Sequence, residues 1–260
     1  MIGNMSSSLE NIAVTRAMKS RNELGIGSMD AVDILKILKD RENISIIMTP
    51  LDGEISGLFM RKNDIGIIII NSNRSYGHQL FTAAHEYYHL KYDKGMNSKL
   101  CPINKYDEGY ENEIEANIFA SYFLMPDDTL RIYINERTDN GNRRLNIRDL
   151  IYLENYFMVS HSLMLYRLKS MGYITRGEEE EFKYSIISKA TKLGYDAKLY
   201  KNTADRGLVI HSNYAELAEE LLEAKLITAG KYEELLLRGG YEEILFGDID
   251  EGEKEEHYAI

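Results

Sequence analysis

The residues of this chain best suited to chemistry lie together in the stretch from Phe81 to Tyr92, which reads FTAAHEYYHLKY. It contains His85, Glu86 and His89 in the pattern H-E-x-x-H, and residues i and i+4 of a helix lie on the same face. The two imidazoles can therefore bind one metal ion, with the Glu86 carboxylate beside them in reach of a water on that metal. Two histidine ligands, a carboxylate base and an open coordination position are what a zinc hydrolase site requires.

A third ligand must come from elsewhere in the chain, and a helix predicted over residues 111–125 offers candidates. This segment reads ENEIEANIFASYFLM and ends before Pro126. Glu113 lies at the edge of its apolar stripe and is the first candidate, with Glu115 as the main competitor. The alternative interpretation is a solvated acidic helix start, because the helix dipole favours Glu there. Asn117, one turn after Glu113, is placed to hydrogen-bond a ligand histidine.

Three strand-like pieces precede the H-E-x-x-H segment and are expected to position it. They cover Asn43 to Met48, Ile55 to Met60 and Asp64 to Asn71, and short turn signals separate them. This pattern predicts an α+β fold, in which a small mixed or antiparallel sheet of about three strands packs on the H-E-x-x-H helix and further helices. The remainder of the chain predicts a mostly helical C-terminal region.

Composition limits the cellular setting and the classes of partner. The 260 residues are 44% hydrophobic and 28% charged, as in ordinary soluble globular proteins. Because the net charge is −11, a broad surface for a phosphate backbone is disfavoured. The single cysteine, Cys101, precedes Pro102 in a predicted loop and cannot form an intrachain disulfide. With no signal peptide and no long apolar run, we expect a cytoplasmic protein that does not contact the membrane.

The chain resembles the ImmA/IrrE family of zinc metallopeptidases, which are H-E-x-x-H proteins of the gluzincin kind. The matching residues are Ile70-Asn71 at the end of a strand, then FTAAHEYYH, then EIEANIFASYFLMP from Glu113 to Pro126. The Ser56-Gly57 pair in the middle strand also fits. The resemblance covers about Ile12 to Tyr173. One departure is Tyr88, because family members usually carry a small residue before the second histidine.

This resemblance implies a zinc-dependent endopeptidase that cleaves a helix-turn-helix (Xre-type) transcriptional repressor and so relieves repression of a mobile element or stress response. It implies that His85, His89 and Glu113 bind one zinc ion per chain and that Glu86 is the general base. The expected domains are a metallopeptidase core over residues 1–130, a helix-turn-helix-like helical layer over 131–175, and a mostly helical accessory region with an acidic tail over 176–260.

Two other functions remain open at this level. A regulatory protein could keep the metal and sequester a repressor without cutting it. A DNA-binding regulator could use residues 146–172, whose pattern predicts a helix-turn-helix with Arg167 facing a groove. Direct DNA binding is the weaker alternative, because the second helix carries few cations and such helical hairpins are common packing units. His78 and His161 are the histidines to examine as additional site residues, although a structural role is the simpler interpretation of each.

Overall fold

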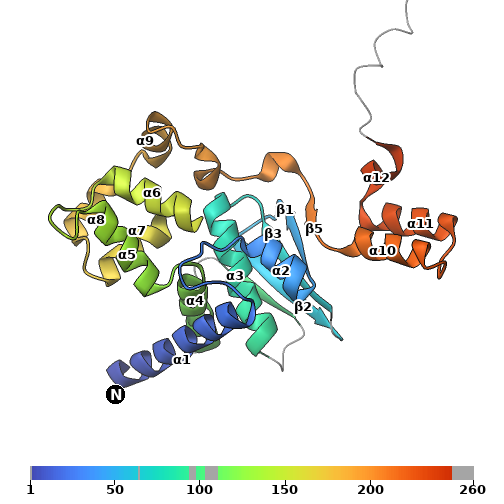
Figure 1. The fold of residues 1–260 in the computed structure, drawn as a ribbon, viewed down its shortest axis with the longest axis horizontal. Helices are drawn as coiled ribbons and strands as arrows, with labels where there is room; N and C mark the ends of the chain where they lie inside the picture. The colour runs from blue at the N-terminus through green and yellow to red at the C-terminus, as the bar shows by residue number, and fades with distance from the viewer. Residues whose placement is uncertain (1, 64, 94–97, 103–110, 248–260) are drawn as a thin grey trace, which may run out of the picture. The chain divides into compact units, whose positions relative to one another are not determined.

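The computed structural model describes residues 2–63, 65–93, 98–102 and 111–247 (Figure 1). The chain divides into two compact units, Met1–His211 and Ser212–Ile260. The first unit contains the sheet, the H-E-x-x-H helix and the helical layer that follows. In the second unit the described residues form the helices α10 (Tyr214–Glu223), α11 (Ala229–Gly239) and α12 (Glu242–Phe246). None of the described helices is long and apolar enough to cross a membrane.

A five-stranded mixed sheet in the order β4-β2-β3-β1-β5 organises the first unit. β1 (Ile44–Thr49) pairs in parallel with β3 (Ile65–Asn71), and β2 (Ile55–Lys62) pairs antiparallel with β3. The three strands predicted from the sequence thus form the centre of the sheet, and the α+β fold is confirmed. Two short strands at the edges were not predicted. β4 (Ser98–Pro102) pairs with β2, and β5 (Val209–His211) pairs with β1. Cys101 therefore lies in a strand, not in the predicted loop.

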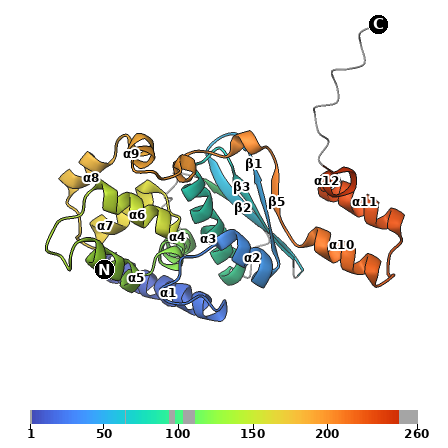
Figure 2. The same cartoon turned by 45° about the horizontal axis from the view of Figure 1, so that its top comes forward.

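Helices of the first unit cover the sheet and extend beyond it. α2 and α3 pack against the sheet, while α1 lies beside α4 and α4 packs on α3. Figures 1 and 2 show the helices α5 to α8 gathered on the side of α3 and α4 that faces away from the sheet. The helices are α1 (Ile2–Glu23), α2 (Ile34–Glu42), α3 (Tyr76–Tyr92), α4 (Glu111–Leu124), α5 (Asp127–Arg137), α6 (Ile147–Phe157), α7 (His161–Ser170), α8 (Arg176–Phe182) and α9 (Ile186–Lys192), with short 3₁₀ turns η1 (Ala197–Tyr200) and η2 (Ala204–Arg206).

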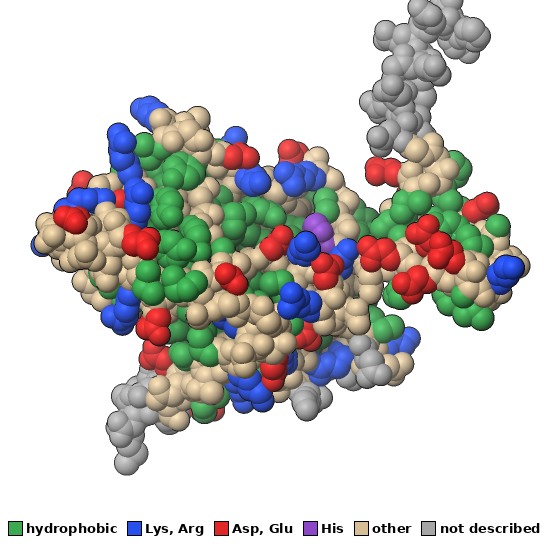
Figure 3. Space-filling model, in the orientation of Figure 1, with side chains coloured by type: hydrophobic (Ala, Val, Ile, Leu, Met, Phe, Trp, Pro, Cys, Tyr) green, Lys and Arg blue, Asp and Glu red, His purple; other side chains and the backbone are tan. Residues whose placement is uncertain are grey.

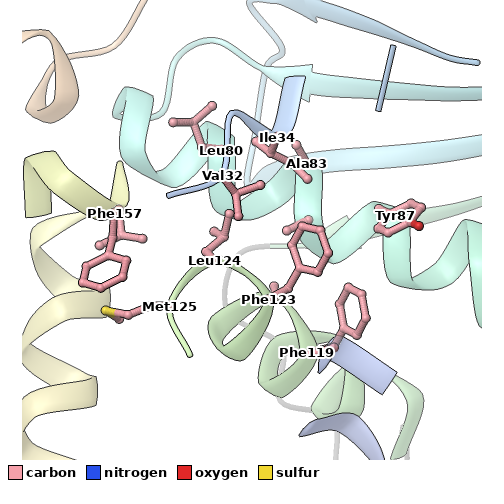
Figure 4. Packing of buried hydrophobic residues seen from close by; sticks show 14 of the residues in the cluster. Val32, Ile34, Leu80, Ala83, Tyr87, Phe119, Phe123, Leu124, Met125 and Phe157 are labelled. Atoms are coloured by element: carbon pink, nitrogen blue, oxygen red, sulfur yellow. The ribbon is translucent and has the colours of Figure 1, made fainter. Parts of the chain in front are cut away.

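The core of the first unit surrounds α3, because this helix is buried on most of its circumference. Tyr87 of α3 meets the aromatic rings of Phe119 and Phe123 from α4, and Leu80 and Ala83 of α3 belong to the same buried cluster (Figure 4). All five side chains are at most 4% exposed. Burial of this much apolar surface fixes the rotation of α3 and α4 about their axes. This packing brings His85 and His89 of α3 next to Glu113 of α4.

Both ends of α3 are also tied to other elements. At its start, the Tyr76 backbone N–H donates to the Lys201 carbonyl oxygen at 2.8 Å. At its end, the guanidinium of Arg61 in β2 donates to the carbonyl oxygens of His89, at 3.3 Å, and Leu90. A cation at a helix C-terminus interacts favourably with the helix dipole and satisfies carbonyls that lack helical partners. The helix that carries the H-E-x-x-H pattern is therefore held along its length and at both termini.

Candidate metal centre

The two histidines of the pattern point their Nε2 atoms at the same place. His85 Nε2 and His89 Nε2 lie 3.1 Å apart, one turn from each other on α3. His89 is completely buried and its ring stacks on Phe59 of β2, with centroids 5.6 Å apart and planes inclined by 14°. His85 is 6% exposed and forms the more open side of the pair. The spacing read from the sequence thus produces the expected convergence of imidazoles.

Glu113 of α4 completes a three-residue group with these imidazoles. Its carboxylate oxygens lie 3.2 Å from His85 Nε2 and 3.4 Å from His89 Nε2. The potential ligand atoms of the three residues all lie within 4.8 Å of one another. Ligand atoms about 2.0–2.1 Å from a tetrahedral metal ion are separated by about 3.3 Å. The observed separations therefore fit a tetrahedral ion held by two imidazoles and one carboxylate, with a fourth position left for another ligand.

Each histidine is oriented by a hydrogen bond at its other ring nitrogen. His85 Nδ1 lies 3.1 Å from the Asn117 side-chain oxygen, the contact anticipated from the sequence. His89 Nδ1 lies 2.7 Å from an Asp93 carboxylate oxygen. When both Nδ1 atoms donate these hydrogen bonds, both Nε2 lone pairs are available to a metal. Such partners fix the ring orientation and raise the basicity of metal-binding histidines.

The environment of His89 makes proton and metal compete for it. Burial alone would lower the pKa of His89, but the hydrogen bonds to Asp93 and Glu113 and the charge of Glu86 outweigh burial and raise it to about 9. The same carboxylates that favour the proton also favour a divalent cation. A metal that takes the Nε2 lone pair must displace this proton, as metal binding by histidine generally requires.

Glu86 lies inside the fold, next to a glycine that makes room for it. The residue is completely buried, and an added Cβ on Gly57 of β2 would come within 3.4 Å of Glu86 Oε1. The carboxylate therefore lies over the surface of the sheet at the point where β2 has no side chain. The carboxylate is shielded from bulk water, and its charge acts on His89 of the three-residue group.

Glu115, the competitor for the third ligand position, faces away from the histidines. It is 7% exposed, and its Oε2 accepts hydrogen bonds of 2.5 Å from the Tyr88 hydroxyl and from the Arg16 guanidinium of α1. The interpretation of Glu115 as a ligand is therefore wrong. The same contact explains the unusual Tyr88. Its side chain is fully buried on α3, and its hydroxyl contacts both Arg16 of α1 and Glu115 of α4, so it joins the three helices.

His161 and Arg167 have structural roles, while His78 lies on α3. His161 in α7 forms a buried pair with Glu154, with 2.6 Å between Nδ1 and Oε1. Arg167 is 1% exposed and donates to the backbone oxygens of Ser121 and Met125, so the prediction that it faces a DNA groove is wrong. On the face drawn in Figure 3, lysines and arginines are scattered among acidic residues and do not form a patch. His78 Nε2 lies 3.0 Å from the Ser56 hydroxyl, two turns before His85.

Comparison with known families agrees with this arrangement. Residues 39–169, which are 131 of the 260, match the peptidase M78 family, described as the IrrE N-terminal-like domain. The chain belongs to this family. The IrrE-like region runs from the end of α2 to α7 and includes His85, Glu86, His89 and Glu113. The family supports a function of the metallopeptidase type. A comparison with curated proteins finds no match.

Asp93 contacts the site through His89 but is not predicted from the sequence. It lies four residues after His89, so a continued helix would bring it to the same face. α3 ends at Tyr92, and Asp93 is the residue that follows the last turn. Its side chain is only 7% exposed. The i+4 spacing was the available signal, although an acidic residue after a helix is usually solvated.

Proposed function

We propose that this protein is a zinc-dependent endopeptidase that cleaves a helix-turn-helix (Xre-type) transcriptional repressor in the cytoplasm, and that cleavage relieves repression of a mobile element or stress response. The observation that carries the peptidase part is the convergence of two imidazoles and one carboxylate at separations of 3.1–3.4 Å, with a buried glutamate beside them. The repressor as substrate rests on the resemblance to the ImmA/IrrE family.

Three residues would hold the zinc ion, and a fourth would move protons. His85 and His89 offer neutral imidazole ligands, and Glu113 offers a carboxylate. The ion, when bound, supplies a water of lowered pKa and polarises the scissile carbonyl group. Glu86 accepts the proton of the attacking water and passes it to the leaving amine. Its burial suits this task, because a carboxylate removed from bulk water interacts more strongly with nearby charge.

The test compares the wild type with Glu86→Gln on a purified Xre-type repressor from the same genome. Glu86→Gln preserves the size of the side chain and all three proposed ligands but removes the base. We expect a discrete cut with the wild type, detected by intact mass, and a rate about 10²- to 10⁴-fold lower with the variant. Zinc content, measured by atomic emission, should stay at one ion per chain in both proteins.

Glu111→Gln is the matched control, because Glu111 is an exposed glutamate in the first turn of α4. It should cleave like the wild type, and a chelator should stop both. Cleavage that persists in Glu86→Gln at the wild-type rate would exclude Glu86 as the base. If the wild type binds zinc and the repressor but leaves it uncut, the sequestering alternative would replace the proposal.

A further inference from the structure

A second polar site lies in the first unit, at the carboxyl ends of the parallel strands β1 and β3. A cavity of about 80 Å³ opens there beside the start of α3. Met48 of β1, Ser72 after β3 and Tyr76 of α3 form one side. The other side is the segment that returns to the sheet after the helical layer and ends in β5, with Arg206 and His211 among its lining residues. None of these residues belongs to the proposed metal centre.

Ser72 gives the cavity an unusual polar group. Both backbone polar groups of Ser72 have hydrogen-bond partners, because its N–H donates to the Thr49 carbonyl at 2.9 Å and its carbonyl accepts from the Thr203 N–H at 3.0 Å. The side chain belongs to a residue that is 1% exposed, yet its Oγ has no hydrogen-bond partner among the described residues. A buried hydroxyl without a partner is costly and rare in native proteins. A ligand in the cavity that bonds to Ser72 would account for it.

Three of the side chains that line the cavity can donate hydrogen bonds to a ligand. Arg206 brings five N–H groups and a positive charge, and Ser72 and Tyr76 bring hydroxyls. Thr203 already donates its hydroxyl proton to Gln79 Oε1 at 2.9 Å. No carboxylate of the described residues lines the cavity. Such a donor-rich surface with one guanidinium is suited to the oxygens of an anion.

Other charges act on this cavity from nearby. The N-terminal end of α3, a helix of 17 residues, carries the positive end of the helix dipole and favours an anion. Asp33 lies outside the lining and acts in the opposite sense, since its charge reaches Tyr76 and His211. Asp33 is exposed to solvent, where water and salt screen its charge, so Arg206 and Ser72, which line the cavity itself, act more strongly on a group inside it.

We propose that this cavity binds a small oxyanion, a carboxylate or phosphate group of roughly five heavy atoms, through Ser72 and Arg206. The volume suits such a group, because one water needs only about 10–15 Å³ measured in the same way. Met48 and Val209 add an apolar wall that accommodates a short carbon chain on a carboxylate. Since Ser72 and Arg206 lie on segments far apart in the chain, a bound anion fastens the return segment to the sheet.

The test is a titration of the full-length, zinc-loaded protein with inorganic phosphate, and in a separate arm with acetate, at constant ionic strength set by chloride. Amide chemical shifts in a ¹H–¹⁵N spectrum report each residue separately. We expect saturable shifts at Ser72, Tyr76 and Gly207 that are independent of any shifts at His85 or His89. The arm with the tighter binding identifies the class of anion. This readout also separates the cavity from anion binding at the metal.

Two variants and a control decide the outcome. Arg206→Ala replaces an exposed residue and should weaken anion binding at least tenfold, because a charged hydrogen bond is lost. Ser72→Ala should also weaken binding, while its melting temperature without anion equals or exceeds that of the wild type. Arg148→Ala, an exposed arginine on α6, should bind like the wild type. Unchanged affinity in both Arg206→Ala and Ser72→Ala, or no saturable shifts at the cavity in either arm, would overturn the proposal.

Discussion

Replacing Gly57 with alanine tests how closely the sheet approaches the proposed catalytic base. A Cβ at this position of β2 would lie 2.5 Å from Thr82 Cγ2, 2.9 Å from the Ile69 carbonyl oxygen and 3.4 Å from Glu86 Oε1. Favourable contacts between carbon atoms lie at about 3.5–4.0 Å. The first two contacts are therefore steric clashes, and the third is tight. The methyl group must push α3 away from the sheet or distort β2.

The loss of stability in Gly57→Ala depends on whether the groups around the added methyl can move. Thr82 is held in place, because its hydroxyl donates to the His78 carbonyl oxygen at 3.0 Å within α3. The Ile69 oxygen is backbone of a central strand and cannot rotate away. Overpacking of this kind costs about 1–3 kcal/mol. For a unit of this size, a loss of about 2 kcal/mol lowers the melting temperature by roughly 4–8 °C.

Activity should suffer more than stability. Moving α3 relative to β2 displaces the Glu86 carboxylate from its place over the sheet, and an error of about 1 Å in a catalytic group can cost about 100-fold in rate. His85 and His89 travel together on α3, and α4 packs on the same helix, so zinc binding should survive. The measurements are thermal unfolding by circular dichroism, zinc stoichiometry and the rate of repressor cleavage.

Thr82→Ser provides the matched control, because it keeps the hydroxyl bond and removes only the Cγ2 methyl. In the double variant Gly57→Ala/Thr82→Ser, part of the lost stability should return, while the clash with the Ile69 oxygen remains. Gly57→Ala with wild-type melting temperature and cleavage rate would refute the reasoning. A double variant no more stable than Gly57→Ala would show that the Thr82 contact is not the source of the strain.

Three further substitutions test separate parts of the structure. Asp93→Asn removes the charge beside His89 and should weaken zinc binding about 10- to 100-fold in a chelator competition. Asp139→Asn changes an exposed aspartate and is the control, and equal zinc affinity in Asp93→Asn and the wild type would contradict the prediction. Arg167→Met leaves its backbone and Asp127 partners unpaired and should lower the free energy of unfolding in urea by about 3 kcal/mol, whereas an exposed arginine would cost almost nothing. The pKa of His78 is lowered to about 4 by burial and by the charges of Arg74 and His85. Between pH 6.5 and 4 the unfolded chain therefore binds more protons, and metal-free protein should lose up to about 3 kcal/mol as the pH falls, with His78→Gln showing a flatter curve.

The parts of the site that the sequence predicts are those set by local spacing. His85 and His89 converge because four residues make about one helical turn, and Asn117 reaches His85 because it lies one turn after Glu113. The three central strands are predictable for the same reason, since each is a short apolar run bounded by turn residues. In each case the information lies within a few residues of the chain.

The remaining features depend on contacts between distant segments. Nothing near Glu115 in the sequence indicates that Arg16 of the first helix lies across from it, or that the Tyr88 hydroxyl contacts both residues. β5 follows a long helical segment and contributes just three residues, so its pairing with β1 has almost no local signature. The burial of Arg167 is of the same kind, because its partners come from α4, the residue that follows it and the start of α5.

The contacts of the first helix determine where the chain can be truncated without losing part of the folded unit. Arg21 of α1 is 2% exposed and donates to the carbonyl oxygens of Phe123, Gly27 and Asp30, so it joins the end of α4 to the loop before α2. The match to the family begins only at residue 39. A fragment trimmed to residues 39–169 would lose this arginine, the Arg16 partner of Glu115 and the closing strand β5. The region matched by the family model is thus shorter than the compact unit that ends at His211, and a truncated form for expression should follow the boundary of that unit.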